Sequence, residues 1–459
     1  MVTPNIILIT IDSLRVDHLG CYGYPQNTSP SIDSLASKGA LFLEAISNGG
    51  ATASAFPSIL ASARPPIQEV EGKAILQRSA TLAEVLKSAG YQTAAFHSNP
   101  MLSRFYGYGK GFDVFDDSFR QFSPKGMRLW IRTRPKSPDN LMAKALRKVR
   151  LILKPILTRV SQGHIISAEE ITSKSMLWLE THKEKFFLWL HYMDVHHPYL
   201  PLPQYIGQFH DQPVSRKRMA SLYRKMLKDP GQLSPSEVAT LIDLYDADIR
   251  YVDDNIGSLL ASLAGDLANT IVIVTTDHGD EFGEHGKFGH QSLHDGVVRV
   301  PLIIAGPGIK AGTVIREPIE LLDLAPTVAD FIGIESPPRF HGKSLLPVIG
   351  GKSRVATGAI STVTNKLEQR FIAYRTSEWK YIRTESPNEA NTMVSEEVYD
   401  LRNDPKERHN MHGSEDEEAR AFELEAVNKI LEFKRLKSEE KTAYEKERIR
   451  AKFKKLPKL

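Results

Sequence analysis

The segment Asn5–Ile11, with the sequence NIILITI, decides the fold of this chain. Its nearly continuous run of β-branched side chains predicts a strand that is buried on both faces. Strands of this kind belong to parallel sheets that are covered by helices on both sides. The strand ends directly in Asp12, so a carboxylate follows the carboxyl end of the predicted strand.

The same strand pattern recurs along the chain. Five further segments predict strands: Leu41–Ile46, Gln92–His97, Phe186–Met193, Thr270–Thr276 and Pro301–Ala305. Segments with helical periodicity lie between them, and the clearest is Asp248–Leu263, whose apolar residues recur every three to four positions. This alternation predicts an α/β fold with a mostly parallel sheet and helices on both faces.

Polar side chains follow the ends of several predicted strands: Asp12, His196, Asp277 and His278. Ligands of such sheets collect at the carboxyl ends of the strands. Carboxylates and imidazoles together can hold a hard or borderline divalent cation. That cation would activate a hydroxyl and polarise an anionic ester, and a nearby histidine would protonate the leaving oxygen. Structural roles compete: Asp12 as a turn cap and His278 as a hydrogen-bonding core residue.

The segment Asn48–Ser62, NGGATASAFPSILAS, presents Thr52 after a pair of glycines and before an apolar, helix-like run. Glycines let the backbone approach a ligand closely, and a helix N-terminus favours an anion. A hydroxyl there is a candidate nucleophile. Taken alone, however, a threonine beside glycines is more often a turn or cap residue.

The composition is that of a globular protein. The chain has 459 residues, 59 of them basic and 55 acidic, and this net charge of +4 is too small to indicate a class of partner. Cys21 is the single cysteine, so no internal disulfide forms, which fits a reducing compartment. No signal peptide and no membrane span are recognised, so we expect a cytoplasmic protein.

Two segments do not match the sheet pattern. From Lys125 to Arg159 there are eleven basic residues against one acid, Asp139, beside an apolar stripe. This segment is interpreted either as a peripheral membrane or polyanion contact, or as an insertion that packs its apolar face on the sheet, and the second is favoured. The tail after Ser414 predicts a helix whose apolar face includes Phe422, Ile430 and Leu431. It would pack on the domain or on a second subunit, so the oligomeric state stays open. Interleaved glutamates argue against a nucleic-acid partner.

Several separated motifs, in order, resemble the sulfatase family, a branch of the alkaline phosphatase superfamily. They are residues 4–39, the segment HYMDVHHPYLPLP at 191–203, VIVTTDHGDEFGEHGKFGH at 272–290, RVPLIIAGPG at 299–308, FHGKSLLPVI at 340–349, and WKYIR with EEVYDLRNDPKERHNM between 379 and 411. The resemblance implies an alkaline-phosphatase-like sheet with a smaller C-terminal α+β subdomain. The expected organisation is a catalytic domain at 1–336 with a basic helical insertion at about 120–165, a subdomain at 337–412 and a charged helical tail at 413–459.

The resemblance also implies roles for individual residues. Asp12, Asp277 and His278 match metal ligands, with Thr52 as a fourth. His196 matches the active-site histidine of the family, and His290 stands where many members have a lysine that contacts the transferred group. The family makes Ca²⁺ the first expectation for the metal, and Mn²⁺, Mg²⁺ and Zn²⁺ are alternatives.

Two departures from the family pattern bear on the chemistry. The chain has Asp12-Ser13 where members usually have two adjacent acids. The family nucleophile is a cysteine or serine that is converted to formylglycine, and counting back from Ser62 places Thr52 at that position. Oxidation of threonine would give a ketone, so the formylglycine route is closed. Another register, with Ser54, is the alternative.

The sequence therefore predicts a metal-dependent hydrolase of sulfate esters or phosphoesters that uses Thr52 as nucleophile, with His196 and His290 as acid/base or anion contacts. A threonine nucleophile is familiar in phosphodiesterases and phosphoglycerol-transferring enzymes of the superfamily, where it forms a covalent phosphothreonine. The alternatives are such a transferase acting at a membrane surface, and a catalytically inactive binding homologue. The expected partner is an anionic ester.

Overall fold

A computed structural model describes residues 3–66, 76, 79–118, 166–182, 184–263, 265–290, 292–353, 358–365, 368–386 and 393–454. The predicted basic insertion, including the 125–159 segment with its expected membrane or packing role, lies outside the described residues.

A nine-stranded sheet with the order β10-β2-β9-β6-β1-β5-β3-β4 forms the centre of the fold, and β11 pairs with β2. Its strands are β1 (Asn5–Ile11), β2 (Ala40–Ile46), β3 (Gln92–His97), β4 (Val114–Asp116), β5 (Phe186–Tyr192), β6 (Thr270–Thr275), β9 (Arg299–Ala305), β10 (Thr313–Ile315) and β11 (Ile319–Glu320). β1 is parallel to both β5 and β6, whereas β9 is antiparallel to β6 and β2. The mostly parallel sheet is confirmed, and each of the six predicted strands ends within two residues of its expected bounds.

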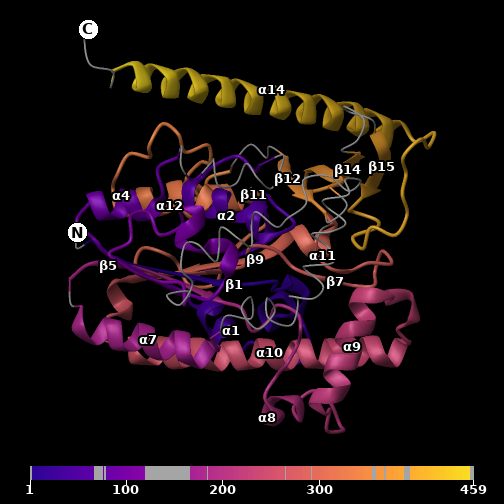
Figure 1. The fold of residues 1–459 in the computed structure, drawn as a ribbon, viewed down its shortest axis with the longest axis horizontal. Helices are drawn as coiled ribbons and strands as arrows, with labels where there is room; N and C mark the ends of the chain where they lie inside the picture. The colour runs from indigo at the N-terminus through magenta and orange to yellow at the C-terminus, as the bar shows by residue number, and fades with distance from the viewer. Residues whose placement is uncertain are drawn as a thin grey trace, which may run out of the picture.

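Helices cover both faces of this sheet (Figure 1). One layer consists of α1 (Pro30–Ser37), α7 (Ala168–Thr181) and α10 (Pro235–Ser262), with α8 (Pro203–Ile206) and α9 (Arg216–Lys228) on the same side. The other layer consists of α2 (Thr52–Ala61), α4 (Leu82–Ser88) and α12 (Leu324–Phe331). Each face has its own hydrophobic core, so the strands of the centre are buried on both sides. None of the described helices is both long and apolar enough to cross a membrane.

The register of the central strands brings their carboxyl ends together. Ile11 of β1 lies beside Tyr192 of β5, and Thr10 lies beside Thr275 of β6. The amide of Asp12 donates a 2.9 Å hydrogen bond to the carbonyl of Tyr192. The segments that follow β1, β5 and β6 therefore start from one edge of the sheet.

A second, antiparallel sheet has the order β12 (Ala359–Thr364), β13 (Arg370–Arg375), β14 (Trp379–Glu385) and β15 (Met393–Asp400). The long helix α14 (Glu417–Lys454) crosses it (Figure 1). Its buried residues Phe422, Ala426 and Ile430 belong to one cluster with aromatic residues of the sheet. The prediction that Leu431 belongs to the apolar face is wrong. Leu431 is 55% exposed, and Phe433 is buried instead, because the helix presents an adjacent row of side chains to the sheet. The domain bounds at 337 and 413 stay predictions.

Buried ion pairs attach the second sheet to the first. Lys380 is fully buried and lies 2.7 Å from Asp295 and 2.7 Å from Glu407. Arg375 lies 2.8 Å from Asp295 and 2.6 Å from Glu44. A buried charge that loses its partner is strongly destabilising, so these pairs fix how the two sheets meet.

The second sheet also holds the turn that precedes α2. The amide of Gly50 donates to the carbonyl of Thr362 on β12, and the amide of Thr362 donates to the carbonyl of Asn48. The short segment before Thr52 is therefore fixed by strand-like pairing with another part of the chain.

Candidate active site

Thr52 is the first residue of α2 and follows extended Ala51. A Cβ at Gly49 would lie 2.4 Å from Ser54 Oγ, and one at Gly50 would lie 2.3 Å from the carbonyl oxygen of Ser292, so only glycine fits at either position. Thr52 is 9% exposed, and its side chain acts on the carboxylate of Asp277, whose pKa it holds down against the larger, raising effect of burial. The Ser54 hydroxyl instead donates to the carbonyl of Ala51 at 2.9 Å. Of these two hydroxyls, it is that of Thr52 which contacts the residues expected to bind metal.

Asp12, Asp277 and His278 converge in a fully buried cluster. His278 Nε2 lies 3.7 Å from Asp12 Oδ1 and 3.5 Å from Asp277 Oδ2. His278 Nδ1 donates to the carbonyl of Gly279 at 3.0 Å, so the lone pair of a neutral ring is on Nε2 and faces both carboxylates. Asp277 Oδ2 and His278 Nε2 have no hydrogen-bond partner among the described residues.

A bound cation would balance the negative charge of this cluster. Burial raises the pKa of Asp12, but His196, His191 and His278 outweigh it and hold that pKa well below its usual range. Burial and the nearby charge of Asp12 raise the pKa of Asp277. Two buried carboxylates and an imidazole lone pair, with two unpartnered atoms among them, fit a divalent cation. The expected ligand set is thus brought together, and it fits the group that the sequence implies.

Three side chains around Asp12 were not predicted from the sequence. Asn99 donates to Asp12 Oδ2 at 2.9 Å, the Ser13 hydroxyl donates to Oδ1 at 3.1 Å, and His191 Nε2 lies 3.3 Å from Oδ2. Ser13 and Asn99 lie two residues after the end of a predicted strand, which is the signal that could have identified them, whereas His191 lies inside a predicted strand, two residues before its end. Ser13 stands where a second acid was expected, so here it supports Asp12 by a hydrogen bond.

A group of histidines lies next to the cluster. The rings of His278 and His290 are 4.4 Å apart, and those of His196 and His290 are 5.2 Å apart. Asp280, which was not predicted from the sequence, is fully buried and joins them: its carboxylate lies 3.0 Å from His290 Nδ1 and 3.3 Å from His197 Nδ1. The two predicted catalytic histidines are therefore neighbours of the carboxylate cluster.

His196 is neutral at neutral pH. Burial, followed by the neighbouring His197 and His290, lowers the pKa of His196 to about 3. Its Nδ1 donates to the carbonyl of His197 at 2.6 Å, which leaves Nε2 as an acceptor. Burial, followed by the neighbouring His278, likewise lowers the pKa of His290.

Arg15 connects the segment after β1 to the segment after β6. It is 7% exposed and makes two hydrogen bonds with Asp17, at 2.9 and 2.7 Å. It also donates to the carbonyl of Asp280 at 2.8 Å and to Glu284 at 2.6 Å. Arg15 thus forms an ion pair with Asp17 and links it to the segment from Asp277 to His290.

A buried carboxyl on the loop that carries His196 predicts a pH dependence of stability. Burial raises the pKa of Asp194 to about 7, and burial with the charge of Asp194 raises that of Asp248 well above its usual value. A carboxyl whose pKa is raised by folding contributes stability below its unfolded pKa, near 3.9, and this contribution is lost as pH rises through about 7. We expect Asp194→Asn to flatten the fall in stability between those pH values and to stabilise the protein at pH 8 by roughly 1–3 kcal/mol.

Urea unfolding at a series of pH values measures this effect. The asparagine keeps the oxygen that accepts from the amide of Ala168. Exposed Asp266→Asn is the control, and its pH profile should match the wild type. An unchanged slope in Asp194→Asn would contradict the prediction.

Comparisons with known proteins find a family model that matches most of the chain. The family model described as Sulfatase matches residues 4–334, more than half of the chain, and the model described as N-sulphoglucosamine sulphohydrolase, C-terminal, matches residues 283–435. A choline-sulfatase of Rhizobium meliloti is 34% identical over 172 residues, which are 36% of this chain and 32% of that protein. The chain thus aligns with about a third of the length of this relative.

Solved structures are similar over nearly the whole chain. One, determined in complex with its substrate D-glucosamine-2-N,6-O-disulfate, has a TM-score of 0.71 at 22% identity and covers 94% of this chain and 98% of its own. The phosphonate monoester hydrolase of Agrobacterium radiobacter has a TM-score of 0.69 at 18% identity and covers 94% of this chain and 96% of its own. At these identities the likeness establishes the fold: a mostly parallel sheet flanked by helices with a C-terminal antiparallel sheet.

Proposed function

The chain belongs to the sulfatase family, and from this we propose that it is a metal-dependent hydrolase of anionic esters in which Thr52 is the nucleophile. The observation that carries the proposal is the position of Thr52 beside Asp277, in a buried cluster with two unpartnered ligand atoms. Buried polar atoms without hydrogen-bond partners lower the stability of the fold, and an inactive homologue would have no reason to retain them.

Asp12, Asp277 and His278 would hold the cation, with Thr52 beside them. When bound, the cation supplies a lowered pKa for the threonine hydroxyl and polarisation of the ester. The ligand set mixes carboxylates with an imidazole, and Ser13 replaces an acid, so it favours Mn²⁺ or Zn²⁺ over the all-oxygen preference of Ca²⁺. The metal expected from the family is revised on this ground.

The remaining side chains bind the ester and handle its protons. The first turn of α2 leaves its leading N–H groups without intrahelical partners, and these favour the transferred anion next to Thr52. Asp277 would accept a hydrogen bond from the Thr52 hydroxyl and so fix its direction. His196 and His290 are neutral in the free protein, and an arriving anion raises their pKa, which enables one of them to donate a proton to the leaving oxygen.

Phosphorus esters suit a threonine nucleophile better than sulfate esters. Attack by Thr52 Oγ1 forms an Oγ1–P bond and breaks the bond from phosphorus to the leaving oxygen, which takes up a proton. Water then attacks phosphorus, breaks the Oγ1–P bond and returns the proton to Thr52. A formylglycine hydrate that carries the transferred sulfate can release it by collapse, without a second attack at sulfur. A threonine cannot use that route. We therefore propose phosphodiesters or phosphonate monoesters as the preferred class, and the second of these is the class that names the Agrobacterium enzyme of similar fold.

A matched panel of four nitrophenyl substrates tests this proposal: a sulfate, a phosphate monoester, a phosphodiester and a phenylphosphonate monoester. We expect the phosphodiester or phosphonate to have the highest kcat/KM, by about 10²-fold over the sulfate. The reason is that an active site binds most strongly the transition state whose charge and geometry it matches. The panel is run with Mn²⁺, Zn²⁺, Mg²⁺ and Ca²⁺.

Preference for the aryl sulfate would overturn the substrate class. Absence of turnover with every substrate and metal, together with no metal uptake, would support the inactive homologue instead. Contact of the 125–159 segment with a membrane and a cytoplasmic location stay predictions.

A further inference from the structure

One buried carboxylate is shared by two histidines beside the carboxylate cluster. Asp280 is fully buried, and its Oδ1 lies 3.0 Å from His290 Nδ1. Its Oδ2 lies 3.3 Å from His197 Nδ1 and accepts a 2.9 Å hydrogen bond from the Tyr199 hydroxyl. Each oxygen of Asp280 therefore faces a different imidazole, and the centroids of the two rings are 5.4 Å apart.

These contacts decide which nitrogen of each ring carries a hydrogen. A carboxylate oxygen only accepts hydrogen bonds, so His290 and His197 each donate from Nδ1. The remaining nitrogen, Nε2, points away from Asp280, and in neither ring does it have a hydrogen-bond partner among the described residues. The side chains of His197 and His290 are 14% and 16% exposed, so a ligand can reach both rings.

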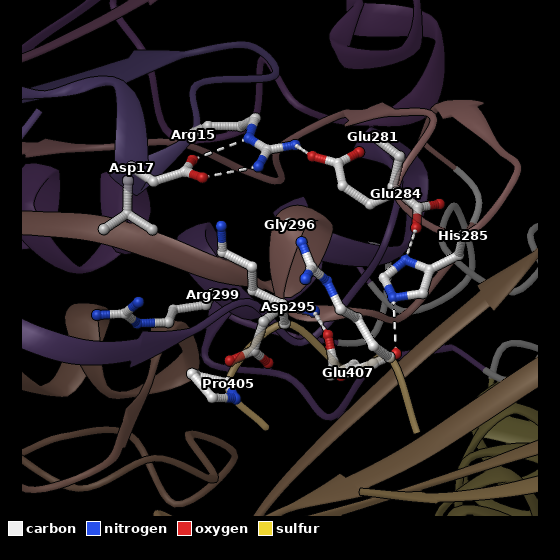
Figure 2. Close-up of a pocket in the computed structure, with 13 residues that line it drawn as sticks. Arg15, Asp17, Glu281, Glu284, His285, Asp295, Gly296, Arg299, Pro405 and Glu407 are labelled. Carbon is white, nitrogen blue, oxygen red and sulfur yellow. Dashed lines mark hydrogen bonds and ion pairs between the residues drawn. The ribbon is translucent and has the colours of Figure 1, made fainter. Parts of the chain in front are cut away.

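The backbone of Asp280 is held as firmly as its side chain. Arg15 Nη1 donates to the carbonyl of Asp280 at 2.8 Å, and the same guanidinium forms ion pairs with Asp17 and Glu284. Figure 2 shows these ion pairs of Arg15 in the wall of a pocket. The carboxylate that orients the two rings is thus fixed before a substrate arrives, and such a fixed arrangement is what positioned catalytic groups require.

We propose that Asp280 is a positioning residue of the reaction proposed above, and that it brings a third histidine, His197, into contact with the substrate beside His196 and His290. Asp280 sets the Nδ1–H tautomer of both rings and leaves both Nε2 atoms for the ester. This inference rests on the proposed function, because it assigns residues to the same site.

The order of the rings gives the two histidines different tasks. His290 lies next to the carboxylate cluster, since its ring centroid is 4.4 Å from that of His278. His197 lies on the other side of His290, and its ring centroid is 5.8 Å from that of Tyr223 on α9. His290 would therefore contact the transferred group, whereas His197 would contact the alcohol part of the ester.

Steady-state kinetics with the preferred ester test these roles. We expect Asp280→Asn to lower kcat by about 10²-fold, because the amide can donate as well as accept and no longer fixes the tautomers. His197→Asn keeps an N–H that can donate to Asp280 but lacks Nε2. It should raise KM by about 3- to 10-fold and change kcat by less than about 3-fold.

A double-mutant cycle separates positioning from a purely structural role. In the His197→Asn/His290→Asn background, Asp280→Asn should lower kcat/KM by less than about 3-fold further, because no ring remains for it to position. The matched control is Asp253→Asn, at a buried carboxylate that accepts 2.8 Å hydrogen bonds from the amides of Ser31 and Ile32. It should lose stability in urea but keep the wild-type kcat and KM.

NMR of the full-length protein with ¹⁵N-labelled histidine gives a readout that needs neither turnover nor a variant that folds well. The wild type should carry hydrogen on Nδ1 of both His197 and His290, and folded Asp280→Asn should not. If no ester of the panel is turned over, the proposed function fails, and this measurement still decides the tautomers. Hydrogen on Nε2 alone in either ring, or an equal effect of Asp280→Asn in both backgrounds, would overturn the positioning role. An unchanged KM in His197→Asn would remove His197 from the site.

Discussion

Thr52→Ala is expected to lower kcat/KM for the preferred ester by about 10³-fold or more, with no loss of folding stability beyond about 1 kcal/mol. The covalent route needs the hydroxyl oxygen of Thr52, the first residue of α2, whose side chain interacts with Asp277. Alanine removes this oxygen but keeps the helical backbone. Steady-state kinetics and urea unfolding of the purified variant measure the two effects.

Two further variants separate the nucleophile from its surroundings. Thr52→Ser keeps a hydroxyl and should retain far more activity than Thr52→Ala. Ser54→Ala, at the position of the alternative register, should stay within a few-fold of the wild type, because the Ser54 hydroxyl is bonded to the carbonyl of Ala51. Mass spectrometry of acid-quenched enzyme should find the phosphoryl adduct on the peptide with Thr52. Normal turnover by Thr52→Ala, or an adduct on Ser54, would move the nucleophile.

Much of this architecture could be predicted because strands that are buried on both faces leave an unmistakable pattern. Asn5–Ile11 and Thr270–Thr275 are rich in β-branched residues throughout, and an acid follows each within two residues. Parallel pairing then obliges Asp12 and Asp277 to lie at one edge of the sheet. The convergence of distant residues thus followed from local sequence and one topological rule.

Other residues of the site could not be predicted in this way. Asp280 joins His197 and His290 from the middle of a turn-rich segment, where no periodicity indicates the direction of a side chain. Leu431 was misplaced because a long helix with a charged surface can present either of two adjacent rows to its support.

Asp277→Asn is expected to have opposite effects on activity and on the stability of the metal-free protein. It removes a metal-ligating charge, so kcat/KM should fall by about 10³-fold and the divalent cation should bind more weakly. In the metal-free protein it also removes one of two buried neighbouring carboxylates, and burial and Asp12 already raise the pKa of Asp277. The free energy of unfolding should therefore rise by about 1 kcal/mol at pH 7 in the presence of a chelator.

This opposition distinguishes a functional cluster from a structural one. A carboxylate that served the fold would leave the protein less stable when replaced by its amide, and adding metal would not change the ranking of the two proteins. Here the wild type should be the less stable protein in chelator and the more stable one in saturating Mn²⁺ or Zn²⁺, because only the wild-type cluster binds the cation tightly. Exposed Asp266→Asn should follow the wild type under both conditions. If Asp277→Asn were destabilised in chelator as well, the two carboxylates would be held by protein contacts, and the cluster would not be a metal centre.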